Sequence, residues 1–223
     1  MTLRFRDRED AGRQLAMELA SYAVDDPIVL ALPSGGVPIG DEVARALRAP
    51  LDVWVTRKIG VPWRPELGMG AVAEGGSVHL CPKILGRVGL SEEELGDAIT
   101  HKQREVEAHI QLYRGGAPRP ILRDRTVIVI DDGIATGGTI RAAIPSIRAQ
   151  GPRKIVIAVP VAAPESVRAL EPEVDRVICL LTPPNLFAVG VWYENFDQMS
   201  DDEAVRVIER ARRDLAESGH AVA

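Results

Sequence analysis

The chain has 223 residues, of which 46% are hydrophobic and 26% charged, and its formal net charge is −5 at pH 7. This length and composition predict a single globular domain, residues 1–223, with a substantial core. The negative balance argues against a nucleic-acid-binding protein, which usually has a basic face. No apolar run approaches the roughly 20 residues needed to cross a membrane.

The cysteines and the N-terminus indicate a compartment. Cys81 and Cys179 are far apart in the sequence and have no metal-ligand spacing, which fits a reducing cytoplasm. The first ten residues, MTLRFRDRED, lack the apolar core of a signal peptide. We therefore expect a cytoplasmic protein that does not bind membranes.

A helix, a strand and a glycine loop open the chain. Apolar residues at helical spacing predict a helix over residues 8–23, and the apolar run 28–32 predicts a buried strand. The loop PSGGVPIG, residues 33–40, opens a second helix that ends near Ala49. The N–H groups of such a loop can bind an anion, but the loop taken alone is better explained as a tight turn.

The next region carries a basic pair. Residues 51–56 are rich in β-formers and predict a strand, with Arg57 and Lys58 at its end. Such a pair could neutralise an anion, although charges at strand ends are also common in solvent. Residues 60–80 predict a loop, followed by two short strands that pair across a Gly-Gly turn.

Residues 81–120 predict a helical insertion. Its long helix starts at a capping box of Ser91 and Glu94 and stops at a Gly-Gly pair. The helix is very polar, and most of its charges are expected on a solvated face. Lys102 and Arg104 are the residues that one face of it could add to a nearby site.

The stretch VIVIDDGIATGGT, residues 127–139, has the most specific pattern. Four apolar, mostly β-branched residues predict a buried parallel strand, and Asp131 and Asp132 follow at its carboxyl end. The small residues 133–139 then precede a helix predicted over residues 140–147. A helix N-terminus suits a phosphate, and small residues let the backbone approach it. Two carboxylates beside a phosphate cradle indicate a sugar phosphate.

This stretch closely resembles the phosphoribosyl pyrophosphate (PRPP) motif of type I phosphoribosyltransferases. In that family the two acids hold the ribose hydroxyls and the loop binds the 5-phosphate. The resemblance therefore implies Asp131 and Asp132 for the ribose. For the phosphate it implies the following loop residues: Gly133, Ala135, Thr136, Gly137, Gly138 and Thr139. The long helical insertion is similar to that of a bacterial subgroup of the family.

The fold implied is α/β, with a doubly wound, mostly parallel sheet like that of the type I phosphoribosyltransferases. Strands predicted at residues 154–161 and 176–181, with a helix at 164–170 between them, continue the alternation that such a sheet requires. The resemblance also implies that the loop at 60–80 is flexible and closes over the substrate. Arg64 and Glu66 are its polar candidates, and a plain connecting loop explains those two side chains equally well.

The resemblance assigns the first glycine loop to pyrophosphate. Ser34, Gly35 and Gly36 would bind it, and the family often has a non-proline cis peptide bond in this loop. Arg57 and Lys58 would face the leaving group, and with the two aspartates they complete the expected catalytic residues. Mg²⁺ is the implied cofactor, held mainly through the substrate with both acids nearby.

One position departs from a well-defined branch of the family. Hypoxanthine–guanine enzymes place an aspartate inside the phosphate loop, near the purine ring, where this chain has Ala135. The resemblance therefore does not imply 6-oxopurine salvage by the usual mechanism. The loop ATGGT resembles the adenine type, but the likeness is confined to the loop, so the acceptor stays open.

Residues 182–223 form an aromatic tail with a final helix. A Ser-Glu capping box predicts the start of that helix. In the family this region belongs to the hood that recognises the nucleobase, so Phe187, Trp192 and Tyr193 are candidates to stack on a planar ring. For any one of them, packing of the last loop onto the core is the stronger alternative.

The sequence thus predicts an Mg²⁺-dependent transferase of nucleotide metabolism. It would transfer the ribose 5-phosphate group of PRPP to a nucleobase or related nitrogen acceptor and release pyrophosphate. A PRPP-binding regulator without catalysis is the main alternative, and a hydrolase that passes the ribosyl group to water is a weaker one. The expected partners are PRPP and a nucleobase-like molecule, without nucleic acid, and a homodimer is compatible with this function.

Overall fold

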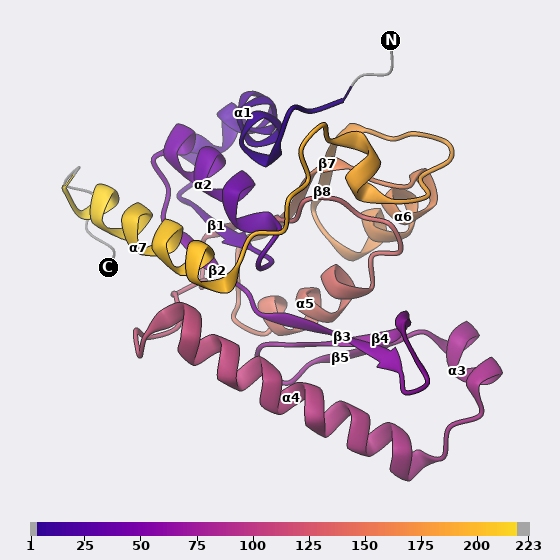
Figure 1. Ribbon diagram of the computed structural model, residues 1–223. Helices are drawn as coiled ribbons and strands as arrows, with labels where there is room; N and C mark the ends of the chain where they lie inside the picture. The colour runs from indigo at the N-terminus through magenta and orange to yellow at the C-terminus, as the bar shows by residue number, and fades with distance from the viewer. Residues whose placement is uncertain (1–3, 218–223) are drawn as a thin grey trace.

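The computed structural model describes residues 4–217, apart from the side chain of Glu66. Its main sheet is parallel, with the strand order β2-β1-β6-β7-β8 (Figure 1). The strands are β1 (Pro27–Ala31), β2 (Leu51–Val53), β6 (Thr126–Ile130), β7 (Lys154–Val161) and β8 (Arg176–Leu181). Their central members are almost continuously apolar because helices cover both faces of the sheet.

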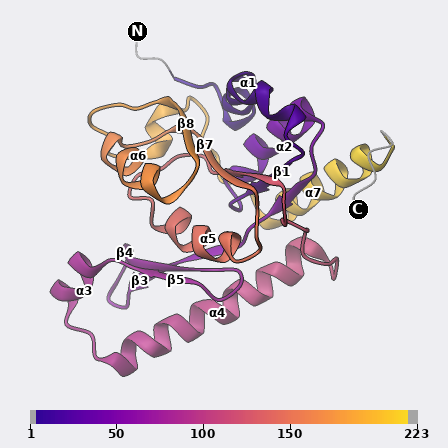
Figure 2. The same cartoon turned by 180° about the vertical axis from the view of Figure 1, so that it is seen from behind.

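Alternate side chains of each strand enter two separate cores. In β6, Ile128 and Ile130 pack with the first core, while Val127 and Val129 pack with the second. The first core is covered by α1 (Arg8–Leu19), α2 (Gly36–Leu47) and α7 (Asp201–Glu217). The second is covered by α5 (Gly138–Arg148) and α6 (Pro164–Leu170) (Figures 1 and 2). The predicted doubly wound α/β fold is confirmed.

A second, antiparallel sheet forms an arm beside the main body. Its strands, in the order β3-β4-β5, are β3 (Thr56–Val61), β4 (Arg64–Ala73) and β5 (Val78–Leu80). The arm lies between α5 and the long helix α4 (Glu92–Arg114), and α3 (Pro82–Val88) joins it to α4 (Figure 2). The predicted capping box is present, since the Ser91 Oγ accepts the N–H of Glu94 and a Glu94 carboxylate oxygen accepts the N–H of Ser91.

Two predictions in this region are wrong in their boundaries. The strand expected at 51–56 is divided between the two sheets, because β2 ends at Val53 and Thr56 already pairs with Ala73 in the arm. The glycines and prolines of residues 60–68 do not form an open loop. They lie in a hairpin of β3 and β4 whose pairing shifts register around Gly60, so the breaker residues mark an irregular hairpin.

Short 3₁₀ segments complete the chain. They are η1 (Ala20–Val24), η2 (Glu171–Glu173) and η3 (Val189–Trp192), and the first of them ends the predicted N-terminal helix in a tighter turn. The predicted box at the last helix is present, since the Ser200 Oγ accepts the N–H of Glu203 at 3.3 Å. Over residues 4–217, no helix combines the length and the apolar character needed to span a membrane.

Candidate functional site

The order of the main sheet places one site at its carboxyl edge. From β1 the chain leaves to β2 on one side, and β6 pairs with β1 on the other side. The helices after β1 and β6 therefore cover opposite faces, and the two loops diverge at a switch point, where α/β sheets bind ligands. The loops are joined here, because the N–H of Leu32 donates to the carbonyl of Ile130 at 2.8 Å.

The glycine loop after β1 packs directly on the acidic loop after β6. A Cβ atom at Gly35 would overlap the Oδ2 atom of Asp132, so only glycine permits this approach. The peptide bond between Pro33 and Ser34 is cis. The Ser34 hydroxyl donates to the carbonyl of Met199 at 3.0 Å, which ties the loop to the segment before α7. Ser34, Gly35 and Asp132, chosen from sequence alone, are neighbours.

We expect Gly35→Ala to lower stability and weaken anion binding at this loop. The added methyl group must displace the Asp132 carboxylate or the loop, at a cost of about 1–3 kcal/mol. Chemical denaturation and a pyrophosphate titration would measure both effects. The matched control is Gly96→Ala in α4, where a Cβ meets nothing within 4 Å. That change should stabilise the helix by about 0.5–1 kcal/mol, and equal effects of the two changes would contradict the close packing.

Two hydrogen bonds fix the small-residue loop after β6 to neighbouring segments, and the helix that follows this loop has no side-chain N-cap. The Ile134 N–H donates to the carbonyl of Val161 at 2.9 Å, and the Ser166 hydroxyl donates to the carbonyl of Ala135 at 2.6 Å. Helix α5 then starts after Gly137, whose φ of +74° favours glycine, and no side chain caps its first N–H groups. Such a start is suited to a phosphate.

The remaining loop residues differ in exposure and in packing. Thr136 is exposed and Thr139 is half-buried, so both lie near the surface at the start of α5. Gly133 instead packs against the hood, because a Cβ there would stand 2.6 Å from a methyl group of Val189. The need for glycine at position 133 is therefore explained by a protein contact, without reference to a phosphate.

The two acids have unequal partners. Asp132 Oδ2 accepts hydrogen bonds from the Nε and Nη2 atoms of Arg8, at 3.1 and 2.8 Å. Its backbone carbonyl accepts the Tyr193 hydroxyl at 2.6 Å. Asp131 Oδ1 accepts the N–H of Asp132 at 2.9 Å, and within residues 4–217 no cationic side chain pairs with the Asp131 carboxylate. Asp131 is therefore the acid left for a ligand.

The electrostatics of the acids favour an incoming cation or hydroxyl donor. Burial, together with the negative charge of Asp132, raises the pKa of the Asp131 carboxyl well above its usual range. Burial also raises the pKa of Asp132, while the Arg8 guanidinium opposes that rise. In the described part of the chain, no third acid, histidine or cysteine joins them in a metal-binding group. The pair fits a Mg²⁺ ion that takes most of its ligands from substrate and water.

The basic pair is divided between the two faces of the arm, because neighbours in a strand point to opposite sides. Arg57 lies against Tyr113 of α4, and it counteracts the rise in the Tyr113 pKa that burial and Asp201 cause. The Tyr113 hydroxyl donates to Asp201, at the start of α7. Lys58 extends over Gly68, where a Cβ would stand 2.6 Å from its Cε atom.

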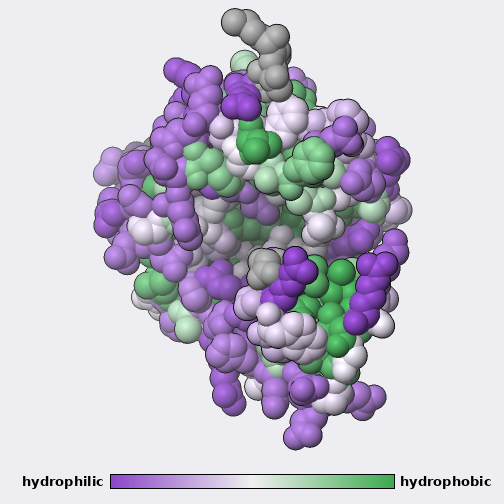
Figure 3. All heavy atoms as spheres, turned by 45° about the vertical axis from the view of Figure 1, so that its right-hand side comes forward, coloured by the Kyte–Doolittle hydropathy of each residue, from purple (hydrophilic) through white to green (hydrophobic). Residues whose placement is uncertain are grey.

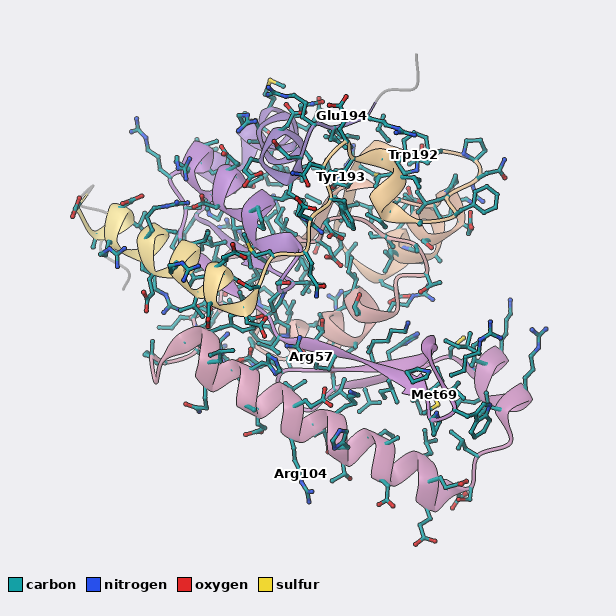
Figure 4. The ribbon with its side chains drawn as sticks, in the orientation of Figure 1. Arg57, Met69, Arg104, Trp192, Tyr193 and Glu194 are labelled. Atoms are coloured by element: carbon teal, nitrogen blue, oxygen red, sulfur yellow. The ribbon has the colours of Figure 1, made fainter. Side chains whose placement is uncertain are left out.

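Arg57 is connected to the glycine loop through these contacts. Asp201 lies two residues after Met199, which accepts the Ser34 hydroxyl. Figure 4 shows Arg57 at the end of the arm nearest the main body, with the hood residues Trp192 and Tyr193 on the other side of the molecule's centre. Figure 3 shows that the surface is hollowed between these two parts.

The hood residues have different surroundings. Phe187 is 92% exposed, while the half-buried Trp192 has an indole N–H without a partner among the described residues. Tyr193 is only 3% exposed, and its ring packs between Phe5 and Phe196 at centroid distances of 5.5 and 5.0 Å. Tyr193 therefore packs the hood onto the core, which is the stronger of the two alternatives given above, because its ring and its hydroxyl already hold the hood on the acidic loop.

The other polar candidates are placed away from the acids or lack a described position. Arg104 is exposed and points outward from α4 in Figure 4, and Lys102 pairs with Glu105 at 2.7 Å. Arg104 is therefore directed away from the main body, whereas Lys102 pairs with a carboxylate that also interacts with Arg57. Arg64 is exposed in β4, and the Glu66 side chain falls outside the described residues.

Sequence reasoning missed Arg8, the cation that pairs with the Asp132 carboxylate. Its charged segment looked like an ordinary solvated N-terminus. Arg8 and Asp132 are 124 positions apart, and nothing in the local pattern joins them. The only signal was the aromatic residue Phe5 among charges, which indicates a segment that packs on something.

The chain is similar to proteins of known family over most of its length. The model of the "Phosphoribosyl transferase domain" family matches residues 6–195. A protein of Mycobacterium tuberculosis strain H37Rv, provisionally named a phosphoribosyl transferase, is 46% identical over 216 residues, which are 96% of this chain and 48% of the relative. The chain therefore spans about half the length of that relative.

Two further proteins extend the comparison. A uracil phosphoribosyltransferase of Geobacillus kaustophilus is 31% identical over 173 residues, which are 76% of this chain and 74% of the relative. The crystal structure of TT1426 from Thermus thermophilus has a TM-score of 0.77 and 39% identity, and the match covers 93% of this chain and 98% of that one. The arrangement of strands and helices described above is thus shared with a solved structure.

Proposed function

Because the chain belongs to the phosphoribosyl transferase family, we propose that it transfers the 5-phosphoribosyl group of PRPP to a nitrogen acceptor and releases pyrophosphate. The observation that carries this proposal is the contact between two loops at the switch point. One loop has a glycine, Gly35, packed against Asp132, and the other runs from Asp131 into an uncapped helix start. Asp131, whose carboxylate can accept hydrogen bonds from hydroxyl groups, therefore lies between two segments that can bind anions, the Gly35 loop and the start of α5.

Each part of PRPP has a proposed partner. The Asp131 carboxylate would accept hydrogen bonds from the ribose hydroxyls. The N–H groups at the start of α5, with the Thr136 and Thr139 hydroxyls, would bind the 5-phosphate. In the loop of Ser34, Gly35 and Gly36, the backbone N–H groups of Ser34 and Gly35 would bind pyrophosphate, because the N–H of Gly36 already donates to the carbonyl of Leu32 at 3.0 Å. Arg57 is the cation that we place next to this loop. Lys58, on the other face of the arm, is the second candidate.

Catalysis by this site would consist mainly of positioning and charge. The bond from the anomeric carbon to pyrophosphate breaks as the acceptor nitrogen attacks, so positive charge develops on the sugar and negative charge on the leaving group. Mg²⁺, when bound through PRPP close to Asp131 and Asp132, would neutralise part of the leaving group's charge. The half-buried Asp131 carboxylate would stabilise the sugar's developing positive charge, and Arg57 would stabilise pyrophosphate.

The proposed acceptor is a nucleobase, and uracil is the first to test. The Geobacillus kaustophilus relative is named for uracil, and Ala135 stands where 6-oxopurine enzymes have an aspartate. Phe187 and Trp192 are the remaining hood candidates for stacking, because Phe187 is exposed and Trp192 is only half-buried. The role in nucleotide metabolism, the cytoplasmic location and the homodimer stay predictions from the sequence.

The deciding experiment is a pyrophosphate-release assay with PRPP and Mg²⁺ against a panel of bases and amines. We expect release with at least one pyrimidine or related acceptor, and no faster release with hypoxanthine or guanine than without acceptor. A chain that binds PRPP tightly and releases nothing with any acceptor would be the PRPP-binding regulator. Release with water as the only acceptor would identify the hydrolase.

A further inference from the structure

The N-terminal segment and the hood form one unit above Asp132. The N–H of Phe5 donates to the carbonyl of Trp192 at 2.9 Å, and the N–H of Glu194 donates back to the carbonyl of Phe5 at 2.8 Å. The Phe5 side chain is buried at 1% exposure. The start of the chain therefore extends the hood, and its position is coupled to that of the C-terminal segment.

Arg8 connects this unit to the acidic loop. Two of its nitrogens donate to Asp132 Oδ2, at 3.1 and 2.8 Å, and its Nη1 atom donates to the carbonyl of Asp197 at 2.8 Å. Its guanidinium carbon lies 3.9 Å from the centre of the Phe196 ring. The side chain is 10% exposed. These contacts use the planar fork of arginine, which lysine cannot reproduce.

Asp132 is consequently fixed on three sides. Arg8 holds its carboxylate, the Tyr193 hydroxyl holds its carbonyl, and Gly35 leaves no space behind it. The N–H of Asp132 in turn anchors the Asp131 carboxylate at 2.9 Å. A displacement of Asp132 would therefore move Asp131 as well.

We propose that Arg8 is a positioning residue for sugar binding and that Asp132 is the fixed support through which it acts. Asp131 is then the acid that contacts the ribose. This inference rests on the proposed function, because it assigns roles within the same PRPP site. Arg8 keeps the charge of Asp132 neutralised next to a strongly anionic substrate, and it keeps the Asp131 carboxylate in one orientation.

The test is a double-mutant cycle on PRPP binding, measured by calorimetry with Mg²⁺ and no acceptor. Arg8→Gln should weaken binding about tenfold in the wild-type background. In an Asp132→Asn background the same change should weaken binding less than twofold, because the partner through which Arg8 acts is already altered. Arg8→Lys should retain part of the affinity, since the charge remains.

The matched control is Arg6→Gln, because Arg6 lies in the same segment but is 67% exposed and pairs with Asp10. It should leave PRPP binding unchanged. Thermal unfolding of every variant shows which are folded, and Arg8→Lys replaces Arg8→Gln in the cycle if the latter unfolds. Equal losses of PRPP affinity in the two backgrounds, or no loss in either, would overturn this inference but leave the proposed function intact. A wild-type chain that does not bind PRPP would overturn the proposed function, and this inference with it.

Discussion

Asp131→Asn is expected to weaken PRPP binding by about 10- to 100-fold, the value of a charge-assisted hydrogen bond of roughly 1.5–3 kcal/mol. The substitution keeps the shape of the side chain and its acceptor for the N–H of Asp132, so the loop should keep its structure. It removes a carboxylate that forms no direct ion pair with a cationic side chain of residues 4–217. Calorimetry with PRPP and Mg²⁺ measures the change.

An exposed aspartate provides the control for this prediction, and a combined variant of the two acids provides the result that could contradict it. Asp26→Asn changes an exposed acid next to β1, at the opposite edge of the sheet, where Arg125 pairs with it at 2.9 Å. It should leave PRPP binding unaltered. Asp131→Asn and Asp132→Asn combined should abolish binding. A combined variant that still binds PRPP like the wild type would show that the site has been placed at the wrong residues.

The order of elements could be predicted because each one has a local cause. The strands at 154–161 and 176–181 and the helix at 164–170 were predicted with the bounds that β7, β8 and α6 have in the structure. Continuous apolar runs between turn residues are enough to define buried parallel strands. The two capping boxes fixed the starts of α4 and α7 for the same reason, since capping involves side chains only three residues apart.

The predictions that failed depend on contacts between distant segments. The glycines of β3 and β4 looked like loop residues, but Gly60 and Gly68 lie where the other strand's backbone or Lys58 comes too close for a side chain. For Tyr193 the sequence left both stacking and packing open, and the contacts of its ring with Phe5 and Phe196 show that the ring is enclosed. The spacing of apolar residues does not predict contacts between distant segments, so the packing of the hood and the contact of Arg8 with Asp132 could be found only in the structure.

A buried charge cluster fixes the arm to the main body. The Arg114 side chain, at the end of α4, is 3% exposed and donates to Glu74 at 2.6 and 3.0 Å and to Asp52 at 3.1 Å. Glu74, which follows β4, is fully buried and also accepts Arg119 at 2.8 Å, while Arg212 reaches Asp52 at 3.2 Å. The cluster joins the arm that carries Arg57 to the edge strand β2.

Arg114→Met should lower the free energy of unfolding by about 3–5 kcal/mol. The change leaves the carboxylate of Glu74 buried with a single, partly exposed cation, and an unpaired buried charge is the costly outcome of breaking an ion pair. For a chain of this size the melting temperature should fall by roughly 6–20 °C. Thermal and chemical denaturation measure the two quantities.

Two comparison variants separate charge from packing. Arg104→Met alters an exposed arginine of the same helix, so it should change stability by no more than about 0.5 kcal/mol. Adding Glu74→Met to Arg114→Met removes the isolated charge and should recover part of the loss, because a buried ion pair replaced by apolar groups is often neutral. If the double variant were instead clearly less stable than Arg114→Met, packing around the cluster would contribute more to stability than the pairing of its charges. If it recovers, the arm is held mainly by the requirement that Glu74 and Asp52 have a buried cation between them.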